Sequence, residues 1–331
     1  MNASIIGAGS WGTALAIVLA PRFERIRLWA HERDLVDRMF STRVNDVFLP
    51  GVSLPLNVEP TADLGYALAD AGIVVGAMPS RFARPLYREM LPHLAPSMRF
   101  VSATKGLEQG SLLRMSEVAH QAIAEKFDPR VAVLSGPTFA REVARGEPTA
   151  LVIASGDREL AASIQREFSG PTFRLYANDD PVGVELGAAL KNIIAIAAGI
   201  CDGLGLGSNT MAALITRGLA EITRLAVALG GRPRTLSGLA GLGDLVLTCN
   251  GDLSRNRTVG IELAKGRKLA DIVSSMTMIA EGVETTSAAC DLARKCHVDM
   301  PITAQMDAIL RGRTSPRDAI RELMERELKT E

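Results

Sequence analysis

Three glycines near the N-terminus, Gly7, Gly9 and Gly12, have the spacing G-x-G-x-x-G. They follow an apolar run at residues 3–6, typical of a buried strand, and precede residues 13–19, typical of a helix. In a dinucleotide-binding fold, the first glycine permits a tight turn, the second leaves room for the pyrophosphate, and the third lets helix and strand pack closely. The helix N-terminus then presents free N–H groups to the phosphates. The pattern therefore predicts a dinucleotide site rather than a glycine-rich turn without a ligand.

A second chemical feature is Lys191, which precedes Asn192 in the middle of a stretch, residues 182–200, that is apolar almost all round. A helix of this kind is buried. Burial lowers the pKa of a lysine towards the range that is useful for proton transfer. The alternative is a lysine whose stem packs in the core while its head reaches solvent. The spacing alone favours neither interpretation.

Three further stretches carry groups that suit a phosphorylated ligand. Lys105 follows an expected strand, where ligands of parallel sheets bind, although an ordinary surface lysine is the alternative. Gly136-Pro137-Thr138 can bring backbone N–H groups near an anion or form a simple turn. Ser254-Arg255-Asn256 at a helix start can surround a phosphate through the arginine fork, the hydroxyl and the amide, or merely cap the helix.

Cofactor choice depends on the residues after the second expected strand, at residues 25–30. In NAD-specific folds an acidic residue about 20 positions past the glycines binds the ribose hydroxyls, and an arginine there accepts a 2′-phosphate instead. Here Glu32 and Arg33 stand side by side after His31. A charged corner without a ligand is also compatible with this triplet. We expect NADP to be accepted, with NAD as the alternative.

The elements that must position these residues divide the chain in two. Residues 1–180 alternate strands with helices, which predicts an α/β domain with a Rossmann-type, mainly parallel sheet covered on both faces. Residues 44–60 hold three prolines and little periodicity, so we expect a surface excursion, followed by Thr61 as a helix cap. Residues 181–331 predict an all-helical domain, with helices at 182–200, 210–229, 253–264, 269–275, 285–295, 302–311 and 316–329. The cleft between the two domains is the expected substrate site.

Composition excludes several classes of protein. The 37 basic residues balance the 37 acidic ones, so we expect no nucleic-acid partner. The four cysteines form no C-x-x-C pair and fit a reduced cytoplasmic protein, and the histidines are too scattered to predict a metal site. No basic region precedes the first apolar run, as a signal peptide would require. Charged residues interrupt the longest apolar stretch, so we expect no stable membrane insertion.

The chain as a whole resembles the bacterial type of NAD(P)-dependent glycerol-3-phosphate dehydrogenase. The segments that carry the resemblance occur in the family's order over nearly the whole chain: GAGSWGTALA, SATKGLE, LSGPTFAREV, ELGAALKNIIAIAAGI, LAGLGDLVLTC, SRNRTVG, AEGVETT and MPIT. The resemblance implies that Lys191 is the catalytic proton acceptor and that NADP or NAD is the cofactor. It implies a substrate pocket of Lys105, Gly136, Thr138, Lys191, Asp244, Ser254, Arg255 and Asn256. It implies cofactor contacts from Gly7, Gly9, Ser10, Trp11, Gly12, His31, Arg33, Lys105, Ala140, Arg255, Ile279 and Glu281.

The implied reaction is reversible hydride transfer between dihydroxyacetone phosphate and sn-glycerol 3-phosphate, which supplies the backbone of phospholipids. A small phosphorylated substrate and a second copy of the chain, in a homodimer, are the expected partners. One alternative is a 3-hydroxyacid dehydrogenase of the hydroxyisobutyrate or 6-phosphogluconate type, which shares a Rossmann domain, a helical domain and a Lys-Asn pair. Another is a nucleotide sensor without catalysis, which the set of Lys191, Asp244 and Arg255 disfavours.

Overall fold

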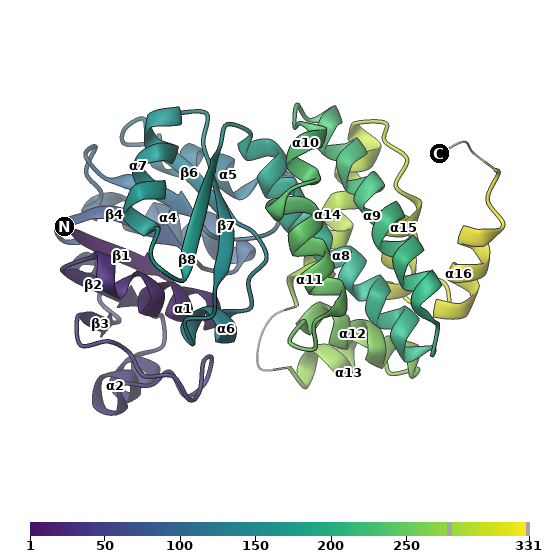
Figure 1. The fold of residues 1–331 in the computed structure, drawn as a ribbon, viewed down its shortest axis with the longest axis horizontal. Helices are drawn as coiled ribbons and strands as arrows, with labels where there is room; N and C mark the ends of the chain where they lie inside the picture. The colour runs from purple at the N-terminus through teal and green to yellow at the C-terminus, as the bar shows by residue number, and fades with distance from the viewer. Residues whose placement is uncertain (277–279, 329–331) are drawn as a thin grey trace.

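The computed structural model describes residues 1–276 and 280–328. A sheet domain and a helical domain lie side by side (Figure 1). Eight strands form one sheet in the order β3-β2-β1-β4-β5-β6-β7-β8. Their bounds are β1 Asn2–Ile6, β2 Arg25–Trp29, β3 Val58–Thr61, β4 Ala71–Gly76, β5 Arg99–Ser102, β6 Arg130–Ser135, β7 Thr149–Ala154 and β8 Phe173–Asn178. Every neighbouring pair is parallel except β6 and β7, so the sheet is mainly parallel, as predicted.

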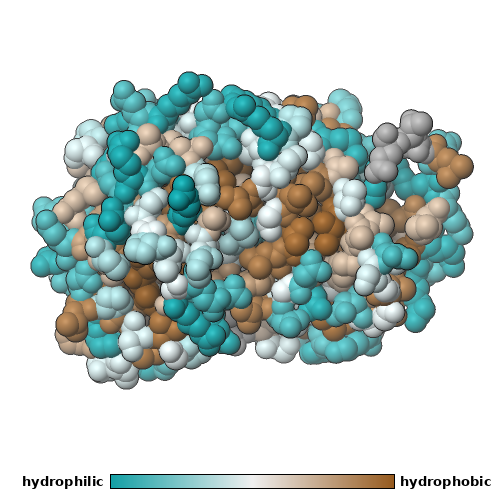
Figure 2. Space-filling view, in the orientation of Figure 1, coloured by the Kyte–Doolittle hydropathy of each residue, from teal (hydrophilic) through white to brown (hydrophobic). Residues whose placement is uncertain are grey.

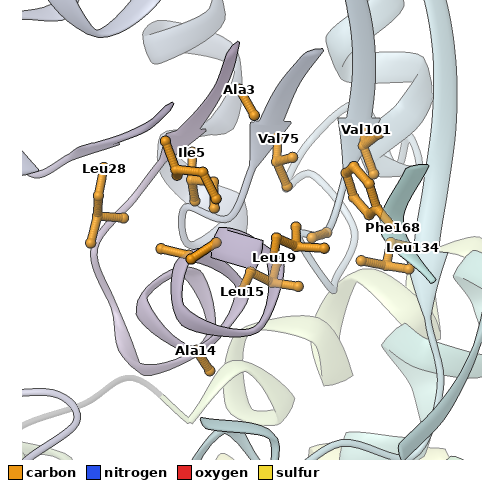
Figure 3. Close-up of a cluster of buried hydrophobic side chains, with 14 of the residues drawn as sticks. Ala3, Ile5, Ala14, Leu15, Leu19, Leu28, Val75, Val101, Leu134 and Phe168 are labelled. Atoms are coloured by element: carbon orange, nitrogen blue, oxygen red, sulfur yellow. The ribbon is translucent and has the colours of Figure 1, made fainter. Parts of the chain in front are cut away.

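Side chains alternate in direction along the strands, so a hydrophobic core lies on each face of the sheet. Ile5 and Ile6 are both fully buried, but they belong to different core clusters because successive side chains point to opposite faces. Ile5 belongs to the same core as Leu15 and Leu19 of the first helix and as Phe168, which lies beside Val101 and Leu134 (Figure 3). The helices of this domain are α1 Ser10–Leu19, α2 Arg33–Thr42, α3 Leu64–Leu68, α4 Ala83–Met90, α5 Met115–Ile123, α6 Ala140–Ala144 and α7 Arg158–Phe168, with short 3₁₀ turns at Ala20–Arg22, Ser80–Phe82 and Leu91–His93.

The second domain is built around α8, Pro181–Gly203, which packs against α9, α11, α12 and α14. Its other helices are α9 Ser208–Ala228, α10 Pro233–Leu236, α11 Asp244–Asn250, α12 Arg255–Ala264, α13 Leu269–Ser274, α14 Glu281–Lys295, α15 Pro301–Leu310 and α16 Pro316–Met324, and a π-helical turn, η4 Leu239–Gly243, precedes α11. The expected fold class, α/β followed by all-α, is confirmed.

By length and composition α8 is apolar enough to cross a membrane. The expectation that its charged residues make it too polar for a membrane span was wrong. The whole of its apolar window is nevertheless buried inside the protein. The charged residues on it have protein partners. Glu185, for example, accepts hydrogen bonds from the Ser116 backbone N–H at 2.8 Å and from Arg114 Nη1 at 2.6 Å, and so joins α8 to the sheet domain.

Several local predictions were wrong. Residues 44–60 are not a simple surface excursion, because Asn45, Leu49 and Leu54 are buried and the segment leads into the edge strand β3. Thr61 ends that strand, and the cap of α3 is Asp63, whose carboxylate accepts from the Tyr66 N–H at 2.9 Å. The short helices α2, α6, α10 and α11 were not anticipated, and α14 begins four residues earlier than expected, at Glu281 rather than residue 285.

Candidate active site

A cleft of about 810 Å³ lies between the two domains. The glycine-rich loop and the carboxyl ends of β2, β4 and β5 line one wall, and α8, α12 and α14 line the other. Ligands of parallel sheets bind at this edge, where the strands end. Most residues singled out in the sequence line the cleft: Gly7, Gly9, Ser10, Trp11, His31, Lys105, Thr138, Ala140, Lys191, Ser254, Arg255, Asn256 and Glu281.

Four of the singled-out residues lie behind the lining or beside it. Gly12 and Asp244 are buried, under the glycine-rich loop and under Lys191 respectively. Gly136 lies beneath Lys105, whose Nζ is 3.5 Å from its carbonyl oxygen. Arg33 is exposed at the first position of α2, so only its neighbours His31 and Glu32 line the cleft. Ile279 lies outside the described residues.

The glycine-rich loop has the geometry that a bound dinucleotide needs. Gly7 has φ +115°, and a Cβ there would lie 2.8 Å from the Ala77 carbonyl oxygen. A Cβ on Gly12 would lie 1.8 Å from the Gly7 carbonyl oxygen, so α1 approaches the turn as closely as only glycine allows. A Cβ on Gly9 would meet nothing within 4 Å, which leaves open space in front of the N-terminus of α1. These residues fit the phosphates of NAD or NADP.

Lys191 stands at the floor of the cleft in a network of three side chains. Its side chain is 6% exposed, and its Nζ donates to Asp244 Oδ1 and to Thr248 Oγ1, the latter at 2.7 Å. The Thr248 hydroxyl donates in turn to the Asp244 backbone carbonyl at 2.6 Å. The other carboxylate oxygen, Asp244 Oδ2, lies 2.9 Å from Lys105 Nζ. One buried carboxylate therefore holds two ammonium groups, one from each domain.

This surrounding sets the proton affinity of Lys191. Burial lowers the pKa of its ammonium from 10.5 to about 7, the Asp244 carboxylate opposes this shift, and the positive charge of Lys105 adds to it. A group with a pKa near neutrality is populated in both forms at physiological pH. Lys191 is therefore suited to give a proton to a ligand in the cleft and to take one back.

The Ser254-Arg255-Asn256 motif forms the start of α12, on the helical wall of the cleft. The Ser254 hydroxyl accepts from the Arg257 N–H at 3.3 Å as the N-cap, and Asn256 Oδ1 accepts from the Gly282 N–H at 3.0 Å. Ser254 thus caps α12, and Asn256 connects α12 to α14. Both residues also line the cleft. Arg255 is the exposed charged member of the motif. It lines the cleft with a guanidinium fork that suits a phosphate.

Glu281, the first residue of α14, adds a carboxylate to the same wall. Its side chain lines the cleft and is only partly exposed. Burial raises its pKa from 4.5 to about 7, while the positive charges of Arg255 and Lys105 act in the opposite direction. Near neutral pH the cleft therefore holds both an acidic and a basic group close to their midpoints.

Comparisons with known proteins agree with this site. Residues 2–161 match the family described as NAD-dependent glycerol-3-phosphate dehydrogenase N-terminus, and residues 180–321 match the corresponding C-terminus. The chain belongs to the NAD-dependent glycerol-3-phosphate dehydrogenase family. A glycerol-3-phosphate dehydrogenase (NAD(P)+) of Koribacter versatilis is 60% identical over 99% of this chain and 98% of its own length. That of Syntrophotalea carbinolica is 53% identical over 100% and 99%.

A solved structure extends the likeness to three dimensions. The crystal structure of glycerol-3-phosphate dehydrogenase from Coxiella burnetii has a TM-score of 0.92 and 42% identity, and the match covers 98% of this chain and 99% of that one. The predicted membership of the glycerol-3-phosphate dehydrogenase family is thus confirmed. The comparisons favour it over the 3-hydroxyacid dehydrogenase alternative.

Within this glycerol-3-phosphate dehydrogenase fold, two residues that the sequence interpretation missed contribute to the site. Thr248 accepts from Lys191 and lies four residues after Asp244 on α11. That i, i+4 spacing puts both side chains on one helix face and is the signal that was available in the sequence. Asn45 is buried against the glycine-rich loop, and no local sequence pattern predicts this contact.

Proposed function

We propose that the chain interconverts dihydroxyacetone phosphate and sn-glycerol 3-phosphate with NADP(H) or NAD(H). The observation that carries this proposal is the buried Lys191 ammonium, held by Asp244 and Thr248 at the floor of a cleft that begins at a dinucleotide-type glycine loop. A reversible carbonyl reduction needs a positioned proton donor beside a cofactor site, and the cleft offers both.

The chemistry follows from the charge of Lys191. When the ketone is reduced, its carbon gains a hydride, and its oxygen gains a proton from the Lys191 ammonium, which is left neutral. When the alcohol is oxidised, the neutral amine takes the hydroxyl proton back. The nicotinamide, when bound, supplies or accepts the hydride. Asp244 keeps the amine in place and raises its pKa, while Lys105 places a second positive charge near the substrate oxygen.

The remaining assignments divide the cleft into a cofactor part and a phosphate part. We assign the dinucleotide to Gly7, Gly9, Ser10, Trp11, Gly12, His31, Arg33, Lys105, Ala140, Arg255, Ile279 and Glu281. We assign the substrate to Lys105, Gly136, Thr138, Lys191, Asp244, Ser254, Arg255 and Asn256. Support comes from the shared cleft that most of these residues line, and from the guanidinium of Arg255 among them.

Initial-rate kinetics test the proposal directly. Dihydroxyacetone phosphate should drive NADPH or NADH oxidation, whereas unphosphorylated 3-oxo acids should not. Turnover of the oxo acids alone would point to the 3-hydroxyacid dehydrogenase alternative. Cofactor binding without turnover of any carbonyl compound would point to a nucleotide sensor.

We also propose that residues 1–180 and 181–331 act as the two domains. In support, β8 ends at Asn178, α8 begins at Pro181, and the two largest core clusters divide between these halves, apart from Leu107. We further propose that the protein acts in the cytoplasm and that its product supplies glycerophosphate for phospholipids. The four cysteines, which are free thiols in the structure, fit a reducing compartment.

A homodimer is the assembly that we propose. Apolar side chains are exposed on neighbouring helices of the second domain, among them Val227 of α9, Leu242 of η4 and Val246 of α11. Figure 2 shows a hydrophobic area over this half of the molecule. A contiguous apolar area of this kind marks an association surface. Light scattering of the purified protein should give twice the mass of the chain, and a monomer mass would contradict this proposal.

A further inference from the structure

Asn45 connects a remote segment to the glycine-rich loop. It lies in residues 43–57, between α2 and β3, and its side chain is completely buried. Its Nδ2 donates to the Ala8 carbonyl oxygen and to Thr13 Oγ1, both at 2.8 Å. Its Oδ1 accepts from the Phe48 N–H at 3.0 Å. The Ala8 carbonyl can only accept and the Phe48 N–H can only donate, so these partners fix the orientation of the amide.

The contact restrains one peptide plane of the loop. The Thr13 hydroxyl also donates to the Ala8 carbonyl at 3.3 Å, so two side-chain donors hold this oxygen. In a trans peptide the C=O and the following N–H point in opposite directions. Fixing the Ala8 carbonyl therefore fixes the direction of the Gly9 N–H. Gly9 lines the cleft, and the space in front of it is open.

The same segment contributes directly to the cleft. Phe48, Leu49 and Pro50 are part of the lining, and the Leu49 N–H donates to the Asn45 carbonyl at 3.0 Å. Asn45 thus joins two parts of the cleft lining. Its side chain holds both the glycine-rich loop and the Phe48 N–H, and its carbonyl holds the Leu49 N–H. A shift of this residue would displace both parts together.

We propose that Asn45 is a positioning residue for the cofactor: it aims the Gly9 N–H at the pyrophosphate and anchors the wall formed by residues 48–50. The inference deepens the proposed dinucleotide site and depends on it. Because the pyrophosphate is common to NADH and NADPH, loss of Asn45 weakens both cofactors by the same factor. The residue touches neither Lys191 nor Asp244, so the chemical step at saturating cofactor is preserved.

The test compares Asn45→Ala with a matched control on the same segment. Asn57 is half-buried, and its Nδ2 also makes two hydrogen bonds to backbone carbonyls, of Ala20 and Phe23, both at 2.9 Å, but outside the cleft. Dissociation constants for NADPH and NADH are measured by tryptophan quenching, and kcat and KM are measured with dihydroxyacetone phosphate. Asn45→Ala should raise both dissociation constants by about tenfold, the effect of losing a buried hydrogen bond. It should leave kcat at saturating cofactor within about twofold, whereas Asn57→Ala should leave both dissociation constants, kcat and KM at their wild-type values.

A second variant keeps the inference testable if Asn45→Ala does not fold. Thr13→Val removes only the hydroxyl that accepts from Asn45 and donates to Ala8, and leaves the direct Asn45–Ala8 bond in place. It should raise both dissociation constants by a smaller factor. Unchanged affinities in every folded variant of Asn45 and Thr13, or equal losses in Asn45→Ala and Asn57→Ala, would overturn the positioning role. A wild-type chain that binds neither dinucleotide would instead overturn the proposed function.

Discussion

Lys105 and Asp244 form an ion pair between the two domains, with 2.9 Å between Nζ and Oδ2. Lys105 follows β5 of the sheet domain, and Asp244 begins α11 of the helical domain. The other oxygen of the same carboxylate accepts from Lys191. A fully buried carboxylate thus compensates two cations that would otherwise repel each other at the floor of the cleft.

Asp244→Asn should therefore slow the reduction of dihydroxyacetone phosphate by more than the loss of a single hydrogen bond would. Without the carboxylate, desolvation and Lys105 lower the pKa of Lys191 further, because Asp244 is the group that raises it. Reduction requires the protonated amine, so its pH profile should move to lower pH, and kcat at pH 7 should fall by at least ~100-fold. Asp252→Asn is the control, since that carboxylate is exposed and pairs with Arg257 at 3.1 Å. A wild-type profile in Asp244→Asn would contradict the assignment.

Lys191→Met should abolish proton transfer while preserving the fold. Methionine keeps much of the apolar stem that fills the buried site, but it carries no proton. Turnover should fall by at least ~100-fold, the lower range for general acid–base catalysis, with NADPH affinity unchanged. Lys268→Met, at an exposed lysine before α13, should keep full activity. Near wild-type rates in a Lys191→Met variant that binds NADPH would make Lys191 a structural residue only.

The same lysine should set the direction of the pH dependence in the wild-type enzyme. The folded-state pKa of Lys191 is lowered to about 7, so the ammonium loses its proton as pH rises through that value. Oxidation of glycerol 3-phosphate uses the neutral amine and should rise with pH across this range, whereas reduction should fall. Parallel pH profiles for the two directions would exclude Lys191 as the titrating group.

Arg255→Lys should weaken phosphate binding although the charge is kept. A lysine cannot reproduce the two parallel N–H bonds of the guanidinium fork. We expect KM for dihydroxyacetone phosphate to rise by about tenfold or more, which corresponds to a lost charged hydrogen bond. Arg257→Lys is the matched control on the same helix, because Arg257 pairs with Asp202 and Asp252 instead of lining the cleft. Equal KM values in the wild type and Arg255→Lys would remove Arg255 from the pocket.

Opposite charges at neighbouring positions should tune the choice of cofactor. Arg33→Ala should weaken NADPH more than NADH, because an arginine at this position can accept a 2′-phosphate. Glu32→Gln should do the reverse and favour NADPH, since Glu32 lines the cleft and its carboxylate repels that phosphate. Arg38→Ala, further along α2 and paired with Asp46 at 3.2 Å, controls for a general loss of positive charge. The ratio of the two dissociation constants is the measurement, and equal losses for both cofactors in Arg33→Ala would count against its role.

Features that depend on near neighbours in the chain were predictable. The spacing of Gly7, Gly9 and Gly12 indicated a strand, a turn and a helix in succession, because each glycine answers a local steric requirement. The apolar stretch around Lys191 indicated a buried helix, because a helix that is apolar on all sides has no face for solvent. The errors at Thr61 and at residues 44–60 arose where few local signals exist and long-range contacts decide the conformation.

By itself, then, the amino-acid order determined the alternating sheet domain, the helical domain and the place of Lys191 in a buried helix. The tertiary structure alone decided what that lysine touches. Asp244 and Thr248 are 53 and 57 residues away from Lys191, and Asn45 reaches Ala8 over 37 residues. Patterns of period 2 or 3.6 record which face of an element is buried, but not which distant side chain lies against it. The pKa of Lys191 depends on burial and on the charges of distant neighbours from both domains. The folded chain decides this pKa, and the local sequence does not.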